Sequence, residues 1–154
     1  MNLIDELRWR GMIQDIMPGT EDQLRKEMTT AYIGFDPTAE SLHIGSLVPI
    51  LLLVHLQKTG HKPIALIGGA TGMIGDPSGK KATRPQLTRE ALLANAETYA
   101  RQVYRILDRE TTMVRFNSEW LTPMGAEGLI RLAGKWTLAR MMERDDFARR
   151  YASG

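Results

Sequence analysis

The sequence predicts an α/β protein with a parallel sheet and helices on both of its faces. Three short apolar runs predict the strands, at residues 30–35, 63–68 and 112–116. Longer stretches between them repeat apolar side chains at helical spacing. Strands that alternate with helices are typical of βαβ units, in which neighbouring strands are parallel and the connections are right-handed.

The bulk composition is that of one ordinary globular domain. The chain has 154 residues, of which 43% are hydrophobic and 25% charged, so it is long enough to bury a core. Twenty basic and eighteen acidic residues give a net charge of +2, which is too small to indicate nucleic-acid binding by itself. The chain has no cysteine, which excludes disulfides and cysteine-ligated zinc, and we expect no protein-bound metal.

Neither a membrane span nor a secretion signal is expected. The longest uncharged apolar run, 47–54, is far shorter than the ~20 residues that cross a bilayer. The N-terminus carries Asp5 and Glu6 and lacks the apolar segment of a signal peptide. We therefore expect a cytoplasmic protein without a membrane partner.

Helix signals surround the three strands. The expected helices lie at about 2–10, 20–28, 44–58, 88–108, 122–133 and 138–151. We expect a single domain over 1–154, with a helical N-terminal segment (1–29), a β-α-β-α-β core (30–116) and a helical segment (117–154).

The loop after the first strand has the features of an anion-binding site. Asp36-Pro37 breaks the strand, because proline cannot donate to the sheet and the dipeptide favours a turn. A helix then begins near Gly45, and a helix N-terminus attracts anions through its free N–H groups and its dipole. Thr38 and His43 add side-chain donors, and Gly45 lets a planar group lie on the backbone. The pattern predicts a phosphate site.

A glycine-rich stretch follows the second strand. Residues 68–80 contain five glycines, which are needed where the backbone passes close to a ligand or takes positive φ. Asp76 is the one carboxylate in this stretch, and it should lie at the carboxyl end of the sheet, where α/β proteins bind ligands. Lys80 and Arg84 come next on a basic loop whose spacing is not that of a Walker A motif.

These two stretches resemble the class I aminoacyl-tRNA synthetases, in the form typical of bacterial tyrosyl-tRNA synthetases. Residues 43–46 read His-Ile-Gly-Ser, close to the family signature His-Ile-Gly-His, with Ser46 in place of the second histidine. With Tyr32 and the glycine stretch, the resemblance runs from Asn2 to about Met142, with a shortened stretch near 108–111. It implies a Rossmann-like fold of the HUP type.

The resemblance implies activation of L-tyrosine by ATP and transfer of tyrosine to tRNA(Tyr). The residues implied in catalysis on the pyrophosphate side are His43, Thr38, Lys80 and Arg84. The residues implied in tyrosine binding are Tyr32, Gly34, Asp76 and Asn117, the last of which also shapes the pocket wall. The residues implied in ATP binding are Asp36, Thr38, His43, Gly45 and Ser46.

The implied partners are tyrosine, ATP with Mg²⁺ as its counter-ion, and tRNA(Tyr). The family is dimeric, so we expect a homodimer or self-association through residues 125–142. Later features of the family are absent from the 154 residues: the Tyr-x-x-x-Gln helix, the Lys-Met-Ser-Lys-Ser loop and the anticodon-binding domain. We therefore expect the N-terminal half of the catalytic domain.

Other interpretations stay open. Asp36 before Pro37 also fits a simple Asx-turn, and the basic loop at Lys80 also fits a solvated patch. Two further functions compete with the synthetase. A small HxGH-superfamily nucleotidyltransferase fits the chain length, and a non-catalytic or weakly active fragment that binds nucleotide or itself fits Ser46. The context of Tyr32 and the glycine stretch favours the synthetase.

Overall fold

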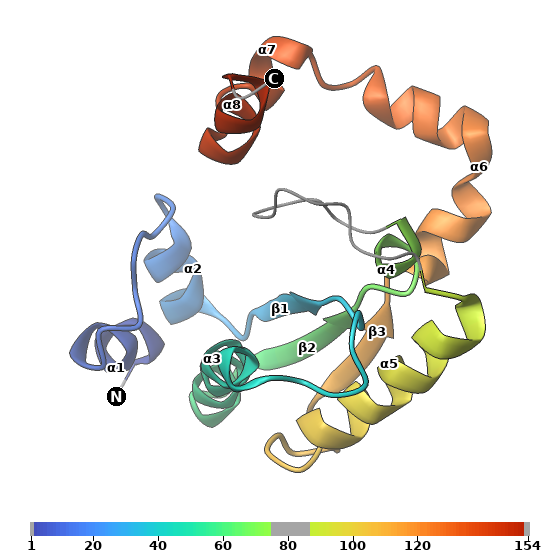
Figure 1. Cartoon of the computed structure of the whole chain (residues 1–154). Coiled ribbons are helices and arrows are strands. Elements are labelled where there is room, and N and C mark those ends of the chain that lie inside the picture. The colour runs from blue at the N-terminus through green and yellow to red at the C-terminus, as the bar shows by residue number, and fades with distance from the viewer. Residues whose placement is uncertain (1, 75–86, 153–154) are drawn as a thin grey trace.

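A three-stranded parallel sheet forms the centre of the computed structural model, which describes residues 2–74 and 87–152 (Figure 1). The strands are β1 (Thr30–Phe35), β2 (Lys62–Ile67) and β3 (Met113–Phe116), in the order β1-β2-β3. Both neighbouring pairs are parallel, and Ile64 lies opposite Tyr32 on one side and Met113 on the other. The predicted parallel α/β sheet is confirmed, with strand ends that differ by one residue.

Helices precede, connect and follow the strands. They are α1 (Leu3–Trp9), α2 (Thr20–Lys26), the 3₁₀ turn η1 (Ile44–Ser46), α3 (Leu47–Lys58), α4 (Thr71–Ile74), α5 (Arg89–Val103), α6 (Ser118–Ala133), α7 (Leu138–Met141) and α8 (Asp145–Ala152). Among the residues that the structure describes, no helix is long and apolar enough to span a bilayer.

Both crossover helices pack against the same face of the sheet. In the order β1-β2-β3, two right-handed crossovers run in the same direction, so α3 and α5 must lie on one side. Phe35 and Ile67 point into this layer, where they share a buried core with Leu53 of α3 and Val103 of α5. Because side chains alternate along a strand, this core uses every second residue of β1 and β2.

The opposite face of the sheet is open in the described part of the chain. Tyr32 is 67% exposed there, and Ile64 and Leu66 are half-buried. The all-apolar second strand suggested burial on both faces, but one complete helical layer covers it. On the second face, α6 reaches the sheet with Trp120.

The N-terminal segment packs beside β1 and α3. Asn2 caps the start of α1, since its Oδ1 accepts hydrogen bonds from the N–H groups of Ile4 (2.8 Å) and Asp5 (3.2 Å). Leu3 and Leu7 join the core. At the start of α2, Gly19 takes the N-cap position and has no side chain to offer.

The C-terminal helices differ most from expectation. α6 begins at Ser118 rather than at 122, because the Glu119 carboxylate accepts a hydrogen bond from the Phe116 N–H (2.8 Å) and stabilises the first turn. The helix then kinks at Gly125, whose φ of 64° is left-handed. Beyond the kink, α6, α7 and α8 extend away from the sheet as an arm, residues 126–152 (Figure 1). The three helices contain no buried residue among those described.

One side chain ties α3 to the turn before β3. Gln57 Nε2 donates to Thr112 Oγ1 (3.0 Å), and Gln57 Oε1 accepts from the Asp108 N–H (3.2 Å). Thr112 is buried, so its hydroxyl depends on a protein partner. Gln57 therefore fixes where β3 starts.

We predict that Gln57→Leu destabilises the fold, because it leaves the Thr112 hydroxyl and the Asp108 N–H without this partner. The expected loss in the free energy of unfolding is about 1–3 kcal/mol, measured by urea denaturation. Lys58→Gln is the control, since Lys58 is exposed and lies next to Gln57 on α3. Equal unfolding midpoints for Gln57→Leu and the control would show that the hydrogen bonds of Gln57 do not contribute to stability.

Candidate functional site

A hollow of about 330 Å³ lies over the open face of the sheet. It is lined by Tyr32, Ile64, Leu66, Met113, Arg115 and Trp120. Gly34 lies one pleat beyond Tyr32 on the same face, and a Cβ built there would meet no atom within 4 Å. The hollow therefore offers apolar walls, one phenol, the Arg115 side chain and open space over backbone, which suits a flat ligand with a polar end.

Polar side chains join the ends of all three strands. Asp36 Oδ1 accepts from Thr71 Oγ1 (2.9 Å), and Thr71 Oγ1 accepts from Asn117 Nδ2 (2.9 Å). Asn117 Oδ1 in turn accepts from the Ala70 N–H (2.8 Å). We call Asp36, Thr71 and Asn117 the strand-end cluster. It lies where parallel α/β sheets bind ligands, at their carboxyl edge.

The glycines beside this cluster make room for protein atoms. A Cβ on Gly68 would lie 2.0 Å from Asp36 Oδ1, and a Cβ on Gly69 would lie 2.6 Å from Ser118 Oγ. Neither glycine has positive φ. The sequence predicted ligand contact or positive φ as the reason for glycine, but here close packing of the strand-end cluster is sufficient.

The loop between β1 and α3 carries the signature histidine. His43 Nδ1 accepts a hydrogen bond from the Gly45 N–H (3.0 Å) and caps η1. A neutral imidazole that accepts at Nδ1 carries its proton on Nε2, so Nε2–H is the donor that His43 can offer to a ligand. The exposed ring lies over Gly45, where a Cβ would be 2.8 Å from His43 Cε1. A side chain at position 45 would displace the ring.

The structure brings some of the predicted site residues together. Asp36 and Asn117 meet through Thr71, and Tyr32 and Gly34 share the open face. His43 and Ser46 form a separate group beside α5, where both residues line a hollow of about 280 Å³. Thr38 follows Pro37 at the other end of the same loop.

Three predicted residues, Asp76, Lys80 and Arg84, lie outside the described residues. How these three residues lie relative to His43 and Asn117 therefore stays a prediction. His43 and Asn117 both follow the carboxyl end of a strand. Among the residues described, no group of three or more His, Asp or Glu side chains could hold a metal ion.

Sequence reasoning missed several residues that shape the site. Thr71 stood unnoticed among the glycines, although a hydroxyl is the one side chain there that can both donate and accept. Glu119 accepts from Arg115 Nε (2.8 Å), and this Arg115 bond, with the Phe116 N–H, lowers the pKa of the Glu119 carboxyl below its usual value. The i,i+4 spacing of Arg115 and Glu119 was the available signal.

Known proteins with similar sequences are synthetases. Residues 24–154 match the model of the family described as tRNA synthetases class I (W and Y). The tyrosine--tRNA ligase of Shewanella oneidensis is 61% identical over 122 residues, which cover 79% of this chain and 31% of that protein. The tyrosine--tRNA ligase of Bacteroides thetaiotaomicron is 51% identical over 156 residues, covering 97% of this chain and 36% of that protein. The chain thus spans about a third of the length of these relatives.

Solved structures with the same fold agree with the sequence relatives. A C-terminally truncated mitochondrial tyrosyl-tRNA synthetase of Coccidioides posadasii matches with a TM-score of 0.75 at 26% identity, covering 100% of this chain and 46% of that one. The corresponding protein of Aspergillus nidulans matches with a TM-score of 0.77 at 25% identity, covering 99% of this chain and 48% of that one. With its signature loop and its parallel sheet, the chain belongs to the class I tRNA synthetase family of tryptophan and tyrosine, and the relatives and solved structures named above are tyrosine--tRNA ligases.

Proposed function

We propose that this chain is part of a cytoplasmic tyrosine--tRNA ligase. The enzyme activates L-tyrosine with ATP, with Mg²⁺ as the counter-ion of ATP, and transfers the tyrosyl group to tRNA(Tyr). One observation carries the proposal. The phenol of Tyr32 is exposed in a hollow beside the strand-end cluster, and the signature histidine lies on the loop that follows the same strand.

The hollow over the open face suits the tyrosine side chain. Ile64, Leu66 and Trp120 provide apolar walls, and Tyr32 provides a hydroxyl that can pair with a phenol. Selection against phenylalanine needs such a partner, because a buried hydroxyl loses a hydrogen bond when the ligand has no phenol. Gly34 leaves room over the backbone. Asn117 would shape the pocket wall, and Asp76 would pair with the ammonium group.

The loop after β1 suits the phosphates of ATP. The tyrosine carboxylate attacks the α-phosphate in line, the new bond gives tyrosyl-adenylate, and pyrophosphate leaves with the electrons of the broken bond. No side chain needs to act as acid or base, so the rate comes from positioning and from charge stabilisation. His43 Nε2–H and the Thr38 hydroxyl would hold the departing phosphates, and Lys80 and Arg84 would close on them.

The adenosine would lie along the start of α3. Asp36, Gly45 and Ser46 are the residues proposed there. Ser46 replaces the second histidine of the family signature, and a hydroxyl reaches less far than an imidazole. We expect Ser46 to weaken the contact with the nucleotide without abolishing the chemistry.

Exchange of labelled pyrophosphate into ATP tests the reaction. The assay is run on this chain and on a longer protein that contains it, with tyrosine, phenylalanine or phosphopantetheine as the second substrate. Tyrosine-dependent exchange is expected. Exchange with phosphopantetheine alone would support the small nucleotidyltransferase, and ATP binding without any exchange would support a non-catalytic nucleotide-binding protein.

We predict that His43→Ala lowers the first-order rate of tyrosine activation and leaves the affinity for tyrosine nearly unchanged, because His43 lies on the phosphate side. A charge-assisted hydrogen bond made mainly in the transition state contributes about 1.5–3 kcal/mol, roughly ten- to a hundredfold in rate. Single-turnover kinetics measures both quantities.

Tyr32→Phe is the matched comparison for His43→Ala. It should weaken tyrosine binding and narrow the preference for tyrosine over phenylalanine, because it removes only the phenol partner. A His43→Ala variant that binds tyrosine less tightly but reacts at the original rate would overturn the assignment of the phosphate site to this loop.

The arm presents exposed apolar side chains within the segment expected to self-associate. Ile130 is 71% exposed and Trp136 is 60% exposed, and Leu129, Leu132 and Leu138 are also exposed. Large exposed apolar patches mark interaction sites. We propose that these side chains pack against a second copy of the chain, which makes the protein a homodimer.

Sedimentation tests the homodimer. We predict an association that Ile130→Glu weakens by at least roughly tenfold, because burying an unpaired carboxylate is costly. Glu127→Gln is the control, since Glu127 is exposed on the same helix and pairs with Arg131. A monomeric wild-type protein at high concentration would contradict the proposal.

A further inference from the structure

Two side chains of α5 hold the loop between β1 and α3 at two points. Asn95 Nδ2 donates to the Pro37 carbonyl oxygen (3.1 Å), and Gln102 Oε1 accepts from the Leu42 N–H (2.9 Å). Asn95 and Gln102 are seven residues apart, which is about two helical turns, so both project from one face of α5. The loop is therefore attached to a rigid helix rather than only to its own ends.

The attachment points adjoin the two side-chain donors of the proposed phosphate site. Pro37 directly precedes Thr38, and Leu42 directly precedes His43. Fixing the carbonyl of Pro37 and the N–H of Leu42 restricts the backbone on which Thr38 and His43 sit. Gln102 also lines the hollow beneath His43 and Ser46.

Burial makes the first attachment specific. Pro37 is fully buried, and Asn95 is one of the few buried polar side chains of the described chain. Gly72 completes this packing, since a Cβ there would lie 3.3 Å from Pro37 Cδ and 2.7 Å from Leu92 Cδ1 of α5. The base of the loop is thus enclosed by α4 and α5, with Asn95 supplying the polar contact.

The backbone partners dictate what each side chain must offer. A carbonyl oxygen can only accept, so position 95 must donate, and an N–H can only donate, so position 102 must accept. An apolar residue at either position would leave a backbone group without its partner. Replacing the amide by an acid therefore has a different effect at each of the two positions. Aspartate fails at position 95, whereas glutamate succeeds at position 102.

We propose that Asn95 and Gln102 are positioning residues for tyrosine activation, which they support by holding Thr38 and His43 in place. This role rests on the proposed function of the loop as the phosphate site. A misplacement of about 1 Å in a reacting geometry can cost up to roughly a hundredfold in rate. Neither side chain need touch a substrate to have this effect.

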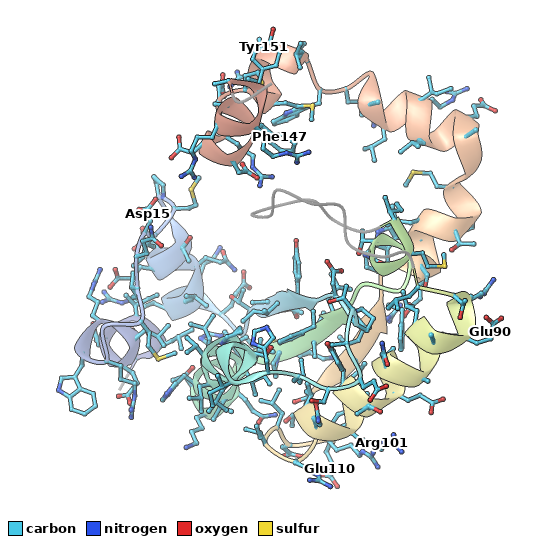
Figure 2. All side chains as sticks on the ribbon, viewed as in Figure 1. Asp15, Glu90, Arg101, Glu110, Phe147 and Tyr151 are labelled. Atoms are coloured by element: carbon cyan, nitrogen blue, oxygen red, sulfur yellow. The ribbon has the colours of Figure 1, made fainter. Side chains whose placement is uncertain are left out.

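The test compares Gln102→Glu, Gln102→Met and Asn95→Asp with the wild-type protein. Each variant is examined by hydrogen exchange of the Leu42 amide and of the segment 36–46, and by the kcat and KM of tyrosine-dependent pyrophosphate exchange. Arg101→Gln is the control, because Arg101 lies beside Gln102 in the sequence but points away from the sheet, with Thr98 of its own helix as partner (Figure 2).

Gln102→Met should remove the exchange protection of Leu42 and lower kcat by roughly tenfold or more, with little change in the KM for tyrosine. Gln102→Glu should keep the protection and most of the rate. Asn95→Asp should increase hydrogen exchange in the segment 36–46 and lower kcat, because a carboxylate cannot donate to the Pro37 carbonyl oxygen. Gln102→Glu and Gln102→Met differ in whether position 102 can accept, so their difference identifies the hydrogen bond to Leu42.

Two results overturn the proposal. Unchanged Leu42 protection in Gln102→Met would mean that the side chain does not hold the loop. Lost protection with an unchanged kcat would mean that the held loop does not matter for the reaction. A wild-type protein without tyrosine-dependent exchange would instead overturn the proposed function, and hydrogen exchange would still decide whether α5 anchors the loop.

Discussion

The right-handedness of the β-α-β connections is the constraint on which the rest of the structure depends. Because the strands follow one another in the order β1-β2-β3, both α3 and α5 are forced onto one face, and the hydrophobic core forms there. The other face keeps Tyr32 exposed and leaves a hollow over the sheet. The same handedness places α5 beside the loop after β1, so that Asn95 and Gln102 form hydrogen bonds with the loop backbone. The pocket and the support of the loop therefore follow from a single rule of chain topology.

The sheet and the general place of the site could be predicted from the sequence because both depend on local patterns. Apolar runs mark β1 to β3, Asn2 marks a helix start, and the signature at His43 marks a loop at a strand end. Contacts between distant segments leave no such pattern. Thr71 joins Asp36 to Asn117 across 35 and 46 positions, and nothing in the neighbourhood of Thr71 indicates this. The roles of Asp76, Lys80 and Arg84 stay predictions, since these residues lie outside the described part of the structure.

One interpretation changed, because packing between protein segments accounts for two glycines that the sequence had assigned to ligand contact or positive φ. Gly68 lies against Asp36 and Gly69 lies against Ser118, and Gly45 likewise lies against the ring of His43. In each case a glycine gives another side chain the room to hold a defined position. Gly68 and Gly69 are thus part of the scaffold that fixes the polar groups at the strand ends.

The kink at Gly125 has a consequence for how this architecture can change over evolutionary time. Its φ of 64° with a ψ of −178° is open almost only to glycine, while the space around it is empty. The direction of the arm is therefore set by one backbone torsion and not by packing, because the described arm buries no side chain. A single replacement at this hinge would swing the arm to a new angle without disturbing the sheet or the pocket. Lineages can in this way alter where the arm lies while conserving the sheet and the hollow over it.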